Sequence, residues 1–199
     1  QSMAVSGDEE GEAAEFPEGS PELPPVVAIL DVAPNLLHEA LKDRLLFDDP
    51  DNLSAEYQPG EKKHGTAMAS LVVHGELDTR SAPLTRKVYH LAVMQPNPQA
   101  RSFNAHDEHF PDEIFFEDRI ARAVLRMLKG EGNVPAQAPG IKIINLSIGD
   151  PYRPFIHTPS PSARLLDWLS WKHRVLFCVS AGNFGENIDV NIPHKELLA

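Results

Sequence analysis

The sequence feature that most constrains the fold is a continuous apolar run at residues 26–30, which ends abruptly at Asp31. Runs of this length without alternating polar residues are typical of strands that are buried on both faces of a parallel sheet. Residues 88–93, 141–146 and 175–179 also read as strands. We therefore expect several strands that belong to one buried, mainly parallel sheet.

Segments with the apolar spacing of helices separate these strands. The strongest pattern covers residues 112–129, and Gly130 follows it as a stop signal. Three more helices are expected at residues 34–46, 64–74 and 162–172. Strands that alternate with helices of about ten or more residues indicate right-handed β-α-β units. The sequence thus predicts an α/β fold, and it contains no internal repeat.

The N-terminal segment differs in composition from the rest of the chain. Residues 1–25 contain seven acids and no Lys or Arg, whereas the whole chain of 199 residues has a formal charge of −11. The start, Gln1-Ser2-Met3, resembles the remnant of a cleaved purification tag. We expect residues 1–25 to be a tag scar followed by a flexible acidic leader, and residues 26–199 to be the folded body.

Composition also excludes several classes of partner. An acidic leader on a nearly charge-balanced body argues against nucleic acid, whose phosphates require a basic surface. No apolar run approaches the roughly 18 to 20 residues of a membrane-spanning helix. A single cysteine, Cys178, rules out an internal disulfide and slightly favours a cytoplasmic location, although the location stays open.

The residues that end the predicted strands are the candidates for a functional site, because ligands bind beyond the carboxyl ends of the strands in open α/β sheets. Asp31 ends the first strand, His64 opens a helix, and Asn183 follows Gly182. Taken singly, each has a structural explanation: Asp31 as a helix cap, His64 as a surface residue and Asn183 as a turn residue. None of the three indicates a function alone.

Taken in order along the chain, these residues fall in four short motifs: VVAILD at 26–31, HGT at 64–66, NLSIG at 145–149 and SAGN at 180–183. This order resembles the subtilisin-like serine proteases, which have an aspartate at the end of a hydrophobic strand, a His-Gly-Thr helix start, an Asn-x-Ser-x-Gly strand edge and an oxyanion asparagine. The spacings agree as well, since Asp31 and His64 are 33 positions apart and His64 and Asn183 are 119 apart. The resemblance covers residues 26–185 and implies a three-layer α/β/α fold.

The resemblance also implies roles for the catalytic candidates. His64 would act as the general base, Asp31 would orient the His64 imidazole, and the Asn183 amide would donate to the oxyanion of the tetrahedral intermediate. A base with a pKa near neutrality, a buried acid and a neutral donor are the groups that this chemistry needs. The resemblance implies no cofactor, and we match no metal site.

The partner implied by the resemblance is an extended polypeptide substrate. Ser147, Ile148 and Gly149 would bind it through backbone hydrogen bonds, in the manner of an added strand. Ala181 and Gly182 would line the pocket for the residue before the scissile bond.

The sequence departs from the family pattern in two motifs. Val32 and Ala33 follow the aspartate where the family usually has a small polar residue and glycine, and Ala67 stands where a second histidine is usual. As a result, residues 65–70 look like the serine motif of the family with alanine at the nucleophile. We reject that interpretation because the serine motif follows the oxyanion asparagine, whereas this segment precedes it.

A larger departure is that no serine follows Asn183 in the remaining 16 residues. We expect a cut within the catalytic domain, so that the fold is incomplete on its C-terminal side and the chain alone does not hydrolyse peptide bonds. The missing C-terminal half would then be a partner, and self-association through the exposed sheet edge is expected.

Two other functions stay open at this point. The first is a non-catalytic module with the subtilase fold that binds extended peptides. The second is a doubly wound small-molecule-binding domain, which predicts no closeness between Asp31 and His64. The sequence has no glycine-rich phosphate fingerprint to support nucleotide binding.

The remaining candidates have structural interpretations. The segment 106–109 (His-Asp-Glu-His) has metal-ligand types but no third ligand nearby, so we favour a solvated loop. Cys178 lies in an apolar run and is expected to be a buried, inert thiol. Trp168 and Trp171 are expected to be core or helix-packing residues.

Overall fold

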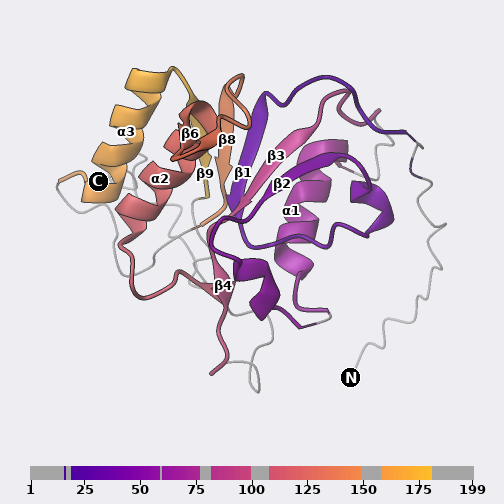
Figure 1. Cartoon of the computed structure of the whole chain (residues 1–199), viewed down its shortest axis with the longest axis horizontal. Helices are drawn as coiled ribbons and strands as arrows, with labels where there is room; N and C mark the ends of the chain where they lie inside the picture. The colour runs from indigo at the N-terminus through magenta and orange to yellow at the C-terminus, as the bar shows by residue number, and fades with distance from the viewer. Residues whose placement is uncertain are drawn as a thin grey trace, which may run out of the picture.

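The computed structural model describes residue 16 and residues 19–58, 60–76, 82–99, 108–148 and 158–180. Their centre is a five-stranded sheet of order β2-β3-β1-β8-β9, in which every neighbouring pair of strands is parallel (Figure 1). In that order the strands are Leu45–Asp48, Val88–Ala92, Val27–Asp31, Ile143–Leu146 and Leu176–Val179. The α/β fold with a mainly parallel sheet is therefore confirmed.

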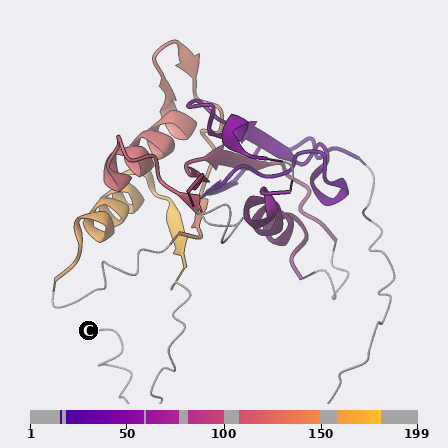
Figure 2. The same cartoon turned by 90° about the horizontal axis from the view of Figure 1, so that it is seen from below.

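In the described residues, three α-helices cover the sheet: α1 (Lys63–His74), α2 (Phe116–Lys129) and α3 (Pro161–His173). Figure 2 shows α1 on one side of the sheet and α2 and α3 on the other, which gives three layers. The helix expected from residue 112 starts four residues later, because Phe115 still has an extended backbone and caps α2. The other two helices begin and end within one residue of their predicted bounds.

Strand β1 is buried on both faces, as its continuous apolar run predicts. Ala28 and Leu30 pack in the larger hydrophobic cluster with Ile120 and Val124 of α2. Ile29 points the other way and packs in a second cluster with Ala69 of α1. Burial on both faces removes each of these side chains from water, which is the main driving force for the three-layer arrangement.

Short elements fill the long connections between strands. The 3-10 helices are η1 (Glu39–Leu41) and η2 (Leu53–Glu56). Within the described ranges, two small antiparallel ribbons are formed by β4 (Gln95–Pro96) with β5 (Glu108–His109) and by β6 (Gly130–Glu131) with β7 (Val134–Pro135). The ribbon of β4 and β5 contacts η2. In chain order η2 follows β2 and β4 follows β3, so both lie beyond the carboxyl ends of strands of the sheet.

The helix predicted over residues 34–46 is wrong. Only the short η1 forms there, Asp43 has a φ of 60°, and the chain then enters the edge strand β2. Leu45 and Leu46 lie opposite Val88 and Tyr89 of β3. The backbone groups at the edge of β3 need hydrogen-bond partners, and this tertiary requirement overrides the helical spacing of the apolar residues.

The expected burial of Cys178 and of both tryptophans is also wrong. Cys178 is exposed, and the exposed fractions of Trp168 and Trp171 are 43% and 78%. Cys178 lies on β9, an edge strand of the described sheet, and no described helix covers its face. Trp168 contacts the Lys172 ammonium and the His173 ring on the outer side of α3 instead of the core.

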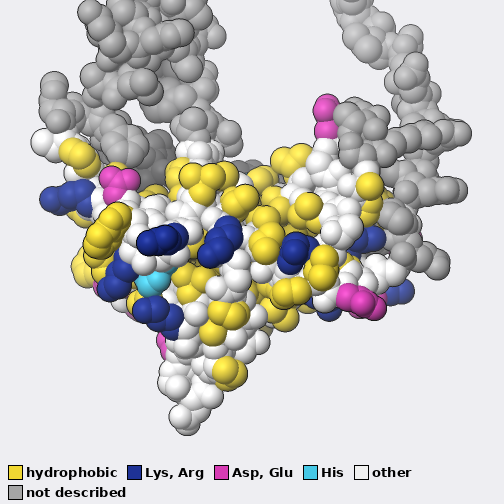
Figure 3. Space-filling view, turned by 90° about the horizontal axis from the view of Figure 1, so that it is seen from above, with side chains coloured by type: hydrophobic (Ala, Val, Ile, Leu, Met, Phe, Trp, Pro, Cys, Tyr) yellow, Lys and Arg dark blue, Asp and Glu magenta, His cyan; other side chains and the backbone are white. Residues whose placement is uncertain are grey.

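The described part of the expected leader lies against the body. Leu23 forms a parallel bridge with Arg86, and the ring of Phe16 lies 5.0 Å from that of His74. This segment passes near the amino ends of the strands, where Lys and Arg side chains lie among hydrophobic ones (Figure 3). Within the described ranges, no helix has the length and hydrophobicity needed to cross a bilayer.

Candidate active site

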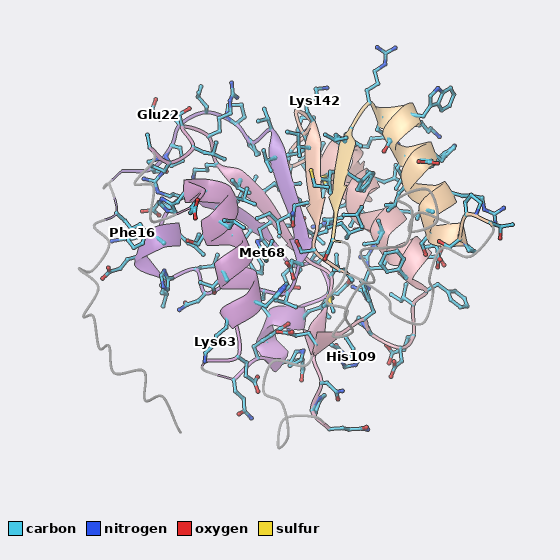
Figure 4. The ribbon with its side chains drawn as sticks, turned by 180° about the vertical axis from the view of Figure 1, so that it is seen from behind. Phe16, Glu22, Lys63, Met68, His109 and Lys142 are labelled. Carbon is cyan, nitrogen blue, oxygen red and sulfur yellow. The ribbon has the colours of Figure 1, made fainter. Side chains whose placement is uncertain are left out.

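The carboxyl ends of the strands bring two of the candidate residues together. Asp31 is the last residue of β1, and His64 lies in the first turn of α1. In Figure 4, Lys63 and His109 lie at one end of the molecule, and Lys142, which immediately precedes β8, lies at the opposite end. The first turn of α1 therefore lies at the carboxyl edge of the sheet, the position that favours a site in this class of fold.

Gly65 allows α1 to approach β1 closely. A Cβ atom added at this position would overlap the carbonyl oxygen of Val32 and lie only 3.0 Å from that of Ala33. Both carbonyls belong to the chain immediately after β1, so α1 packs directly on the backbone that follows Asp31. A glycine at this position is thus a geometric requirement for the meeting of Asp31 and His64.

Asp31 and His64 form a hydrogen-bonded pair. The distance between Asp31 Oδ1 and His64 Nδ1 is 3.0 Å, and Oδ1 also accepts a hydrogen bond of 2.7 Å from the backbone N–H of Val32. The side chain of Asp31 is fully buried, whereas 43% of the His64 side chain is exposed. An ionised carboxylate can only accept, so Nδ1–H of His64 donates and Nε2 is left to accept a proton.

The electrostatic surroundings favour the protonated imidazole. The hydrogen bond with Asp31 raises the pKa of His64, partial burial opposes this, and the negative charges of Asp31 and Glu108 add to the rise. A buried acid that fixes the tautomer of an exposed imidazole and stabilises its cationic form is the arrangement that a general base requires.

This contact excludes the doubly wound small-molecule-binding domain in the form considered above, because that alternative predicted no closeness between Asp31 and His64. The two groups meet across 33 positions of sequence. Asp31 is also not the helix cap of the structural explanation, since no helix begins at residue 34.

The structure describes only part of the expected substrate-binding and oxyanion residues. Ser147 and Ile148 follow β8 and are half-buried, and the Ser147 hydroxyl donates a hydrogen bond of 2.8 Å to Asn145 Oδ1. The other four lie outside the described residues: Gly149, Ala181, Gly182 and Asn183. Their roles stay predictions.

The structure places three polar residues near the Asp31–His64 pair that sequence reasoning did not assign to the site: Tyr57 and His90 lie near Asp31, and Glu108 lies near His64. Glu108 comes from β5, His90 from the middle of β3, and Tyr57 from the residue after η2. His90 could have been noticed as a polar residue inside an apolar strand. No sequence signal singles out Tyr57.

No metal centre is found in the part of the chain that the structure describes, where no group of three His, Cys, Asp or Glu side chains could hold an ion. His106 and Asp107 of the 106–109 segment lie outside the described residues. Glu108 and His109 pair with β4, and His109 Nε2 lies 3.4 Å from Gln95 Nε2.

Comparison with known proteins identifies the class of the chain. The model of the subtilase family matches residues 24–196, which include the four motifs and nearly the whole body. The chain belongs to the subtilase family, a family of serine peptidases.

Structural comparison gives a more distant match, and a search of curated protein sequences gave no match. The structure titled "Structure of Prenylagaramide maturation protease PagA" is 20% identical in sequence, with a TM-score of 0.48. The match covers 83% of this chain and 47% of that one, so this chain spans about half the length of that protein.

Proposed function

We propose that the chain carries the acid and base of a serine endopeptidase, with Asp31 and His64 as two members of an Asp-His-Ser triad. The observation that carries this proposal is the contact of 3.0 Å between His64 Nδ1 and the buried Asp31 carboxylate. Family membership over residues 24–196 supports it independently.

In the proposed reaction, His64 Nε2 takes the proton of a serine hydroxyl as the serine oxygen bonds to the carbonyl carbon of the scissile peptide. The imidazolium that forms is stabilised by Asp31, which keeps its negative charge. His64 then returns the proton to the leaving amine as the C–N bond breaks. The Asn183 amide donates to the carbonyl oxygen, which carries the negative charge of the tetrahedral intermediate.

The proposed substrate is an extended polypeptide that lies beside the chain segment after β8. Backbone groups of Ser147, Ile148 and Gly149 would pair with it as an added strand, and Ala181 and Gly182 would line the adjoining pocket. The proposal takes support from the position of Ser147 and Ile148, which follow a strand directly adjacent to β1 in the sheet.

The proposed nucleophile is not among these 199 residues, because no segment after Asn183 matches the serine motif. We expect the chain by itself to give no turnover of a fluorogenic peptide mixture above the buffer rate. Turnover that is lost in the His64→Ala variant would contradict this part of the proposal.

The pairing of the acid and the base is tested by titrating the histidines by NMR. In Asp31→Asn, the pKa of His64 should fall by at least about one pH unit, because the negative partner is replaced by a neutral one. His173 on α3, whose pKa is lowered by burial and by the charges of Lys129 and Lys172, serves as an internal control whose titration should not change. An unchanged His64 titration would show that Asp31 does not act on His64 in solution.

A further inference from the structure

Behind the Asp31–His64 pair lies a buried group of polar atoms that the proposed mechanism does not use. The buried side-chain atoms without a hydrogen-bond partner in the described residues include Asp31 Oδ2, His90 Nδ1 and the Tyr57 hydroxyl. Buried polar atoms nearly always have a protein or water partner, since leaving one unpaired costs about 1–3 kcal/mol. One such atom on the Asp31 carboxylate and two more near it therefore point to a shared network.

The strand register places His90 beside Asp31. Asp31 lies opposite Ala92, and Ile29 lies opposite His90. Because side chains alternate along a strand, Ile29, Asp31, His90 and Ala92 share the face of the sheet that α1 covers. His90 is fully buried, and its Nε2–H donates a hydrogen bond of 2.8 Å to the carbonyl oxygen of Val32, the residue after Asp31.

The hydrogen bond to Val32 also fixes the state of the His90 ring. A proton on Nε2 leaves Nδ1 as an acceptor in the neutral ring. Burial lowers the pKa of His90, although the hydrogen bond to Val32 and the charge of Asp31 oppose this. His90 is therefore a neutral acceptor, and Asp31 Oδ2 is a second acceptor in the same region.

Tyr57 supplies the donor that these two acceptors lack. Its ring packs against the cluster of Ala33, Leu53 and Ala92, and Ala92 is the register partner of Asp31. Burial raises the pKa of Tyr57, and the negative charges around its hydroxyl raise it further; they belong to Glu108, Asp31, Glu61 and Asp49. The phenol therefore keeps its proton and can donate it to a hydrogen bond.

We propose that Tyr57 is a positioning residue for Asp31, and that its O–H donates to a bound water, which in turn donates to Asp31 Oδ2 and to Nδ1 of neutral His90. The network would hold the second carboxylate oxygen while Oδ1 holds His64. Its importance for catalysis rests on the proposed function, but its existence does not. A hydrogen-bond donor to Oδ2 stabilises the Asp31 carboxylate. Asp31 then binds the His64 imidazolium less strongly, and the pKa of His64 is raised less than it would be without the donor.

The test compares the NMR titration of His64 in the folded 199-residue chain with that in Tyr57→Phe, which keeps the ring and removes only the hydroxyl. The pKa of His64 should rise by about half a pH unit, because Asp31 loses a donor and binds the imidazolium more strongly. The charged groups that face His64 are Asp31 and Glu108, and neither changes in this variant. A pKa that stays the same or falls would overturn the proposal.

Tyr89→Phe is the matched control, since the Tyr89 hydroxyl donates to Asp48 and not to the site. It should leave the His64 titration within about 0.1 pH unit of the wild type. A second readout is the ¹⁵N spectrum of the His90 ring, which should show a proton on Nε2 alone from pH 5 to 8; a proton on Nδ1 would contradict the network.

The outcomes separate this proposal from the proposed function. If Asp31→Asn changes the pKa of His64 and Tyr57→Phe does not, the acid–base pair stands and the Tyr57 network is wrong. If Asp31→Asn has no effect, the pairing itself fails, whatever the result for Tyr57. Near-UV circular dichroism of each variant checks that the fold is retained.

Discussion

Gly65 sets how closely α1 approaches the end of β1. Gly→Ala inside a helix normally stabilises a protein by roughly 0.5–1 kcal/mol, because alanine loses less backbone entropy on folding. Here the added methyl group would overlap the Val32 carbonyl oxygen, which is backbone and cannot move alone. The sign of the effect should therefore reverse.

We expect Gly65→Ala to destabilise the chain by about 2 kcal/mol through overpacking and to separate His64 from Asp31. Urea unfolding measures the first effect, and the His64 titration, which should move back towards that of a free imidazole, measures the second. Ser70→Ala on the same helix is the control and should change the free energy of unfolding by less than about 0.5 kcal/mol. A Gly65→Ala variant as stable as the wild type would show that α1 does not pack this closely.

Single residues also show where sequence reasoning succeeds. Asp31 and His64 could be predicted because each lies in a short motif whose order and spacing along the chain carry the information. Tyr57 and His90 could not, since their place beside Asp31 depends on strand register and on the packing of η2. The exposure of Cys178 cannot be predicted either, because the apolar pattern of a strand does not reveal whether another element covers it.

At the scale of elements, an ionic network joins α2 to the end of β2, to the segment after β2 and to the ribbon of β6 and β7. Arg126 binds Asp48 at 2.7 Å and Glu131 at 2.8 Å, and Arg122 binds Glu131 at 2.6 Å. Asp51 accepts from Arg122 and from Arg119, and Asp48 also accepts from the Tyr89 hydroxyl. The network fixes β2, the edge strand, against the body of the molecule.

We expect Arg126→Ala to cost about 3 kcal/mol of unfolding free energy, and Arg122→Ala less than about 1 kcal/mol. Only 12% of the Arg126 side chain and 14% of the Asp48 side chain are exposed, so removal of Arg126 leaves a nearly buried carboxylate unpaired. Arg122 is 38% exposed and is the matched control on the same helix face. If urea unfolding gave equal losses of unfolding free energy for the two variants, the burial of the ion pair would not be what decides the cost of removing the arginine.

The effect of Arg126→Ala on stability should also depend on pH. Burial alone would raise the pKa of Asp48, but hydrogen bonds from Arg126 and Tyr89 and the charge of Arg126 outweigh burial and lower that pKa. Hydrogen bonds from Arg122 and Arg126 likewise lower the pKa of Glu131. A carboxyl group with a lowered pKa in the folded state adds stability above about pH 4 and loses it as the pH falls through the folded pKa. The stability gap between wild type and Arg126→Ala should therefore narrow below about pH 4.

Elements were predicted best where burial and local pattern agree. The β1 run and the apolar stripe of α2 are strong local signals, and both elements exist. Residues 34–46 carry helical spacing, yet their second half forms β2 because the edge of β3 offers backbone partners. Such pairing depends on residues about forty positions away, and no local pattern in the sequence reports it.

At the scale of the whole molecule, the described sheet is covered unevenly. Ile144 and Leu146 point into the core with α2 and α3, so Ile143 and Asn145 point to the α1 side. There Ile143 lies opposite Leu176, and their exposed fractions are 38% and 61%. Figure 4 shows β8 and β9 beside α1 with no described helix over them. Leu71 of α1, which is 54% exposed, adds to the exposed apolar surface of the molecule.

Exposed apolar surface on an edge strand favours association, since both the side chains and the backbone groups can gain partners. We propose that the 199-residue chain self-associates through β8 and β9, and expect a sedimentation coefficient that rises with concentration. Leu176→Lys should return it towards the monomer value, because a charge replaces the exposed leucine at the edge. Trp171→Lys is the control, since it removes a side chain that is 78% exposed on the outer side of α3. A wild-type chain that stays monomeric at all concentrations would exclude self-association. Equal effects of the two variants would show that the association does not take place through β8 and β9.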